Sequence, residues 1–104
     1  MLIVTTETIP GRRYEVLGIA KGSVVQSKNF GKDFMSAMKT LVGGEITAYT
    51  EMLDEARQIA SGRMAAQAEA MGADAIVCMR YASSSVMQGA AECIAYGTAV
   101  KFID

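Results

Sequence analysis

The stretch 91–103 alternates large and small side chains with a period of two residues, and this alternation constrains the fold more than any other feature of the chain. The large members are Ile94, Tyr96, Thr98, Val100 and Phe102, and the small members are Cys93, Ala95, Gly97 and Ala99. Because successive side chains of a strand point to opposite faces, such a strand has one large face and one small face. The small face predicts close packing of another element against the strand.

The segment 45–71 has the pattern of a long amphipathic helix. Its apolar stripe consists of Ile46, Tyr49, Met52, Leu53, Ala56, Ile59, Ala60 and Met64. Asp54 and Arg57 stand three residues apart, which places them within reach of an ion pair on the polar side. Gly62 predicts a kink or a tight helix contact, and Gly72 is expected to end the helix.

Shorter patterns complete the expected fold. Strands are predicted over 2–5, 14–25 and 74–82, a first helix over 30–42, and turns or loops at Pro10-Gly11 and Ser83 to Ser85. Within 14–25, Gly18 and Gly22 indicate bulges or the close approach of another backbone. The expected order is β-β-α-α-β-β, an α+β two-layer domain with an antiparallel or mixed sheet covered by two helices. At 104 residues the chain is expected to form one domain, 1–104.

An open sheet in so small a domain leaves two free edges, and a bare, long, apolar final strand would promote aggregation. Pairing with a neighbouring subunit removes this hazard. We therefore expect a closed ring of identical subunits, although the edge argument does not set their number.

Charge and composition narrow the function classes. The 10 Lys and Arg residues nearly balance the 11 Asp and Glu residues, giving a formal charge of −1, so neither nucleic acid nor a membrane surface is an expected partner. The chain has no His, which removes the usual general base and the His-rich zinc site, and no enzymatic activity is predicted. Its two cysteines lack CxxC spacing, and no export signal is recognisable, which favours the reducing cytoplasm.

Cys78 and Cys93 are the first candidates for a metal site, because thiolates select soft metals. They fall on successive predicted strands and share a sheet face if the hairpin is centred near residues 85 and 86, whereas a slip of one residue separates them. The alternative is that both are small buried hydrophobic residues.

Carboxylates on the long helix are the second candidates. Glu45 and Glu51 could bind a cation, although a solvated helix face also explains them. The eight methionines could bind Cu(I), but their helical spacing is better explained by core packing. Arg63 and Arg80 interrupt apolar segments, and each is expected to pair with Asp74, Glu69 or Glu92.

Taken together, these motifs resemble the YbjQ family, a group of small bacterial proteins of unknown function that is described as heavy-metal-binding. The segments that carry the resemblance are 17–18, 42–45, 49–51, 63–64, 72–75 and, above all, Ala95-Tyr96-Gly97-Thr98-Ala99-Val100. The resemblance covers nearly the whole chain. It implies a dodecin-like β-α-β-β core and assembly as a homopentamer.

The description of the family as metal-binding resembles an inference from fold similarity to heavy-metal-associated domains. Those domains bind metal through a CxxC-type loop, and this chain has no such motif. In a ring, however, one residue per chain near the axis appears once per subunit, and five copies carry a formal charge of −5, five times −1. Two hypotheses stay open. One is a ring that binds a metal ion or another small ligand through Cys78, Cys93, Glu45 or Glu51, and the other is an interaction module that acts through its oligomeric surface without metal.

Overall fold

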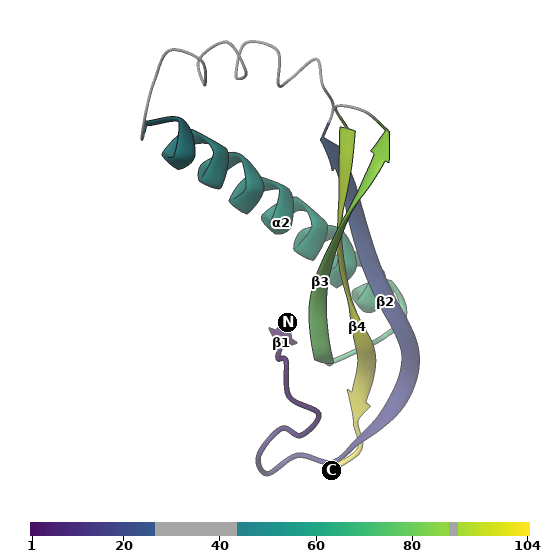
Figure 1. The fold of residues 1–104 in the computed structure, drawn as a ribbon. Helices are drawn as coiled ribbons and strands as arrows, with labels where there is room; N and C mark the ends of the chain where they lie inside the picture. Colours follow the sequence, from purple (N-terminus) through teal and green to yellow (C-terminus); the bar gives the residue numbers. More distant parts are fainter. Residues whose placement is uncertain (27–43, 88–89) are drawn as a thin grey trace.

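The computed structural model describes residues 1–26, 44–87 and 90–104. These residues form strands β1 (Leu2–Ile3) and β2 (Tyr14–Gln26), helix α2 (Gly44–Ala70), and strands β3 (Ala75–Met87) and β4 (Ala90–Phe102). One face of the sheet carries α2, which crosses the strands diagonally (Figure 1). The α+β class and the mixed sheet are confirmed, and the predicted helix over 30–42 lies outside the described residues.

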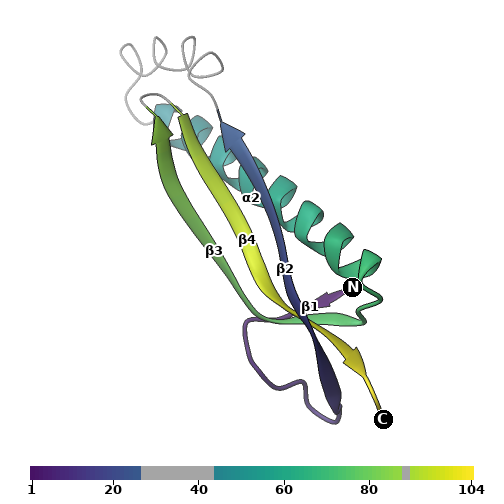
Figure 2. The same ribbon diagram turned by 90° about the vertical axis from the view of Figure 1, so that its right-hand side faces the viewer.

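The sheet has the order β1-β3-β4-β2. β1 pairs in parallel with β3, whereas β4 pairs antiparallel with both β3 and β2. The long alternating strand is therefore central, and the three long strands lie side by side with α2 behind them in Figure 2. This corrects the edge argument, because the strand that raised the aggregation hazard is paired along both sides. The exposed edges belong to β2 and to the part of β3 beyond its short pairing with β1.

Small residues bring α2 close to the sheet. Ala20, Ala95 and Ala99 are fully buried against the helix residues Ala60 and Met64 in one core cluster. Where β2 meets the helix, a Cβ at Gly22 would come within 2.6 Å of the Cβ of Arg63 and closer still to the backbone of Ala60 and Met64. The predicted close packing on the small face is confirmed, and Gly22 is the point of closest approach.

A second core cluster lies on the other face, at the end where the chain begins. It contains Ala75, Val77 and Val100, with the partly buried Val4, Ile9, Tyr14, Cys78 and Phe102 packed around them. The expected Pro10-Gly11 turn is present, since the N–H of Arg12 donates to the carbonyl of Ile9 at 3.1 Å. The segment before β2 therefore folds under the sheet and covers this end of the face.

Several local expectations are settled by the structure. Gly72 ends α2 as predicted, and the N–H of Ala73 donates back to the carbonyl of Ala68 at 3.0 Å. Gly18 lies at a bulge in β2, as the sequence indicated. Gly62 is exposed with no atom near its missing Cβ, so the predicted tight contact there is wrong.

Ser83 to Ser85 also depart from the prediction, because they belong to β3 rather than to a loop. All three pair with residues of β4, with Ser83 opposite Cys93. Polar side chains are compatible with a strand when the flanking register is set by apolar residues on both sides of them. β3 is consequently several residues longer than the sequence pattern indicated.

Candidate functional site

The two cysteines do not come together within one copy of the chain. Cys93 is buried with α2 in the first core cluster, whereas Cys78 packs against the second cluster on the opposite face. Cys93 pairs with Ser83, five positions along β3 from Cys78, a separation of about 15 Å along the strand. Two thiolates of one metal centre would each lie within about 2.3 Å of the ion, so these residues do not form one site together.

Cys78 sits at a bulge in β3, and its backbone adopts a φ of +55°. A β-bulge places two residues opposite one on the neighbouring strand, and here Cys78 and Met79 face Gly97. The N-terminal segment holds this bulge, because the carbonyl of Thr6 accepts from Cys78 N–H and the carbonyl of Val4 accepts from Met79 N–H, both at 3.0 Å. The bulge turns Cys78 toward the second cluster.

The two carboxylate candidates, Glu45 and Glu51, lie at different positions along α2. Glu51 is exposed on α2, and Glu45 is the second residue of that helix. Among the side chains that the structure describes, no three from Cys, Asp or Glu are grouped closely enough to hold a metal ion. One copy of the chain, as far as the structure describes it, therefore does not fit a metal centre.

Arg63 and Arg80 use backbone carbonyls where the sequence suggested acidic partners. Arg80 donates to the carbonyls of Thr5 and Met79 at 2.9 and 2.8 Å, which ties the N-terminal segment to β3. Arg63 donates to the carbonyl of Ser23 at 2.5 Å. Among the described residues the ion pairs are Arg57 with Asp54, as expected, and Arg12 with Asp104.

The contact of Arg63 belongs to a cap on the exposed edge of β2. Gln67, one turn further along α2, accepts the backbone N–H of Lys21 at 2.7 Å through its Oε1 atom. Arg63 and Gln67 thus occupy one acceptor and one donor that an edge strand would otherwise offer to another strand. The helix blocks strand addition at Lys21 to Ser23.

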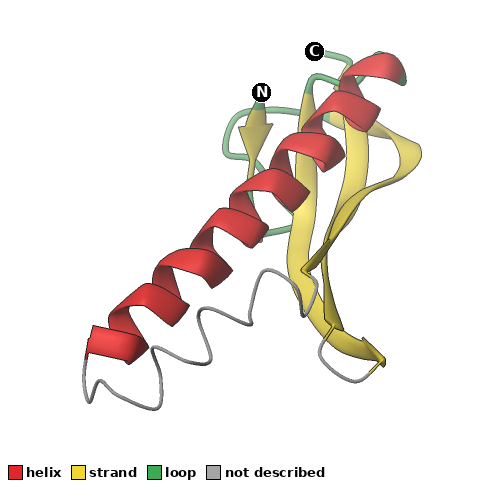
Figure 3. Ribbon diagram, turned by 90° about the horizontal axis from the view of Figure 1, so that it is seen from above, coloured by secondary structure: helices red, strands yellow, loops and turns green. Residues whose placement is uncertain are grey.

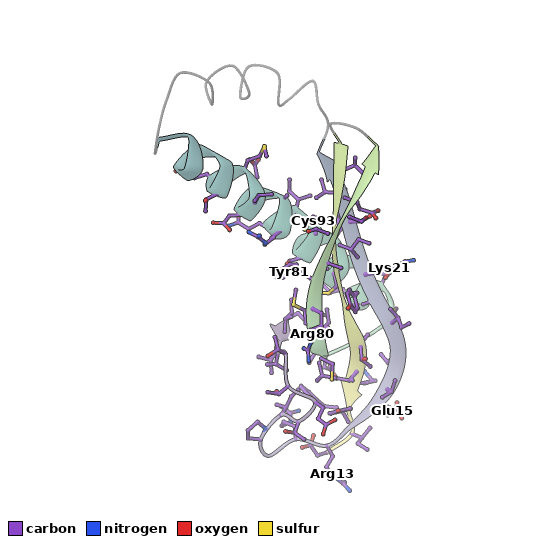
Figure 4. The ribbon with its side chains drawn as sticks, viewed as in Figure 1. Arg13, Glu15, Lys21, Arg80, Tyr81 and Cys93 are labelled. Carbon is purple, nitrogen blue, oxygen red and sulfur yellow. The ribbon has the colours of Figure 1, made fainter. Side chains whose placement is uncertain are left out.

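The most unusual surface of the described chain is the sheet face opposite α2. We define the open face as Ile19, Lys21, Val25, Ile94 and Tyr96, which lie on β2 and β4. Ile19 is 74% exposed, Val25 54% and Tyr96 41%. Lys21 points away from the α2 side, whereas Cys93 and Tyr81 lie on it (Figure 4), and Tyr81 shares a 2.6 Å hydrogen bond with Ser61 of the helix.

The alternation of large and small side chains over 91–103 was the signal for the open face in the sequence. The large members of the alternating strand identified a face, and the pairing of Lys21 with Tyr96 and of Ser23 with Ile94 adds the matching residues of β2. That the helix covers only the small face follows from its packing on Gly22. Figure 3, seen from above, shows α2 along one side of the strands.

Among the described residues, no helix combines the length and the hydropathy that crossing a bilayer requires.

Comparisons with known proteins agree on the family. Residues 1–103 match the family model YbjQ_1, whose description is "Putative heavy-metal-binding". A UPF0145 protein of Clostridium novyi is 56% identical over 99% of this chain and 100% of its own length. Another from Clostridium perfringens is 61% identical over 100% and 99%, and one from Thermotoga petrophila is 60% identical over 97% and 96%.

A solved structure shows the same fold. The crystal structure of a protein of unknown function from the DUF74 family of Pediococcus pentosaceus aligns with a TM-score of 0.69 at 17% sequence identity. The alignment covers 99% of this chain and 98% of the other. From the match over residues 1–103 and the identity of 56–61% to UPF0145 proteins, the chain belongs to the YbjQ (UPF0145) family.

Proposed function

We propose that this protein is a self-associating module that works as a closed ring of identical subunits. The observation that carries the proposal is the open face, whose Ile19, Val25 and Tyr96 are between 41% and 74% exposed. Exposed apolar surface of this kind, rimmed by polar residues such as Lys21, marks sites of protein association. A second copy of the chain is the partner that is always available to it.

We propose five subunits for the ring, the number that the YbjQ resemblance implies. Native mass spectrometry of the protein purified without a metal-binding tag tests this directly, because it reports subunit number and bound mass together. A pentamer is the expected result. A monomer at micromolar concentration would overturn the self-association proposal.

A metal ion or other small ligand is the second candidate function, and the family description favours it. Because the described residues of one copy do not group metal ligands, such a site would take equivalent side chains from several copies. Cys78, Glu45 and Glu51 are the candidates for a shared site near the axis, and Cys93 is disfavoured because it is buried under α2.

The same mass spectra, recorded before and after a chelator, test the metal candidate. Loss of a metal-sized mass from the ring would support binding, and a ring of unchanged mass would leave the interaction module. The triple variant Glu45→Gln, Glu51→Gln, Cys78→Ser identifies the ligands. If that variant binds added Zn²⁺ or Cd²⁺ as the unmodified protein does, these residues are not the ligands.

A further inference from the structure

We infer that the open face of each copy seats the α2 helix of the next copy, through a helix stripe made of Met52, Glu55 and Ile59. This inference rests on the proposed self-association and names the two surfaces that meet. It also determines the type of contact, because a face that binds a helix joins two different patches.

The open face combines exposed apolar side chains with the cationic Lys21, which lies on the edge strand β2. Lys21 lies directly opposite Tyr96 in the β2–β4 pairing, with Ile19 and Ile94 at neighbouring positions. Its side chain is exposed, and it takes part in neither of the two ion pairs found among the described residues. An amine beside apolar residues that a partner covers favours a carboxylate on that partner, because burying an unpaired charge is costly.

The helix stripe offers the matching chemistry. Met52, Glu55 and Ile59 are spaced i, i+3 and i+7, so they share one side of α2. This side differs from the one formed by Ala56, Ala60, Met64 and Ala68, which packs on the chain's own sheet. Met52 and Ile59 are only partly buried, and Glu55 is exposed without an ion pair within the described part of the chain.

Strand addition at the edge of β2 is a competing way to join two copies, and the cap on β2 opposes it. Arg63 and Gln67 already bind the carbonyl of Ser23 and the N–H of Lys21. A neighbour that paired with this edge would have to break both contacts. A neighbour that docks on the face breaks neither.

A face-to-helix contact is heterologous, so every copy presents one of each patch, and a rotation that closes gives the ring proposed above. Two copies joined face to face would instead form an isologous dimer, in which Lys21 of each copy could meet Glu92 of the other. The helix stripe has no part in that dimer. The two arrangements therefore differ in whether substitutions on α2 affect assembly.

Exchanging the charges of Lys21 and Glu55 tests the contact. Both side chains are exposed, so substituting them should not disturb the fold. Lys21→Glu alone and Glu55→Lys alone should each raise the dissociation constant of the assembly about tenfold, measured by sedimentation velocity. The double variant Lys21→Glu, Glu55→Lys should restore it to within a factor of two or three. Arg13→Glu and Glu69→Lys are matched controls at other exposed positions and should leave assembly unchanged.

Mixing two assembly-deficient chains tests the polarity of the contact. Ile19→Asp disrupts the open face, and Met52→Asp disrupts the helix stripe. Each variant alone should be folded by circular dichroism and monomeric in native mass spectra. Mixed in equal amounts, they retain one compatible contact and should form a heterodimer and nothing larger in native mass spectra.

The outcomes separate the two proposals. If the unmodified protein is a monomer, the self-association proposal fails, and this inference fails with it. If the unmodified protein assembles but Glu55→Lys and Met52→Asp assemble equally well, the helix stripe is not the partner. In that case, loss of assembly in Ile19→Asp alone would indicate face-to-face packing.

Discussion

The backbone N–H of Lys21 on the edge of β2 donates to the Oε1 atom of Gln67 on α2 across 2.7 Å. One turn earlier on the same helix, Arg63 donates to the carbonyl of Ser23. The helix that covers the small face of the sheet therefore also closes part of its exposed edge. Long side chains at positions i and i+4 do this because they leave the helix on the same side.

Removing this cap should expose β2 to other strands. The variant Arg63→Ala, Gln67→Ala loses two hydrogen bonds, each contributing about 1 kcal/mol, and leaves edge groups free to pair. We expect earlier aggregation on heating, followed by light scattering and thioflavin fluorescence. Arg57→Ala, Gln58→Ala is the matched control on another part of α2. Equal aggregation of the two variants would show that the contacts do not protect the edge.

Gly22 should tolerate no side chain. Gly22→Ala would push a Cβ into the backbone of α2 at Ala60 and Met64, and we expect a loss of about 3 kcal/mol in the free energy of unfolding, measured by urea denaturation. Gly62→Ala is the matched control, because nothing lies near its Cβ position. It should stabilise the protein by about 0.5 to 1 kcal/mol through helix propensity. A small effect at Gly22 would mean that the helix lies farther from the sheet.

Ser61 and Tyr81 should stabilise the protein as a pair. Their hydroxyl groups lie 2.6 Å apart and join α2 to β3. In a double-mutant cycle with Ser61→Ala and Tyr81→Phe, we expect a coupling free energy of about 0.5 to 1.5 kcal/mol. A cycle in which the two single effects simply add would show that the hydroxyl groups do not interact in solution.

Asp104 should make the stability of the fold depend on pH in the acidic range. Partial burial acts to raise the pKa of Asp104, but hydrogen bonds from the Arg13 N–H and the Arg12 side chain outweigh it and lower that pKa below 3.8. A carboxyl with a lowered folded-state pKa stabilises the fold above its unfolded pKa, and this contribution is lost as the pH falls through the folded value.

The variant Asp104→Asn checks this effect. Its urea midpoint should lie below that of the unmodified protein at pH 7, and the difference should shrink as the pH falls below 3.8. Arg12 also stacks on the ring of Phe102 at 3.7 Å, so Arg12→Ala should lower the midpoint further. A difference that is the same at pH 7 and pH 2 would contradict the assignment.

The sequence by itself determined the elements whose patterns are local. The alternation over 91–103 predicted a strand with a small face, and the stripe over 45–71 predicted α2, because side-chain period reports backbone geometry directly. Gly18, Gly22 and Gly72 were also correctly interpreted, since glycine is needed where the backbone bends or another backbone comes close. The family resemblance rests on these same segments.

Only the tertiary structure decided how those elements combine. The bulge at Cys78 and the extension of β3 through Ser83 to Ser85 changed the register, and a register change separates residues such as Cys78 and Cys93 that parity alone allowed to meet. Likewise, the partners of Arg63 and Arg80 are backbone carbonyls distant in sequence, which no local pattern encodes. The open face exists because α2 packs on one side of the sheet at Gly22, and that choice depends on contacts between segments about forty residues apart.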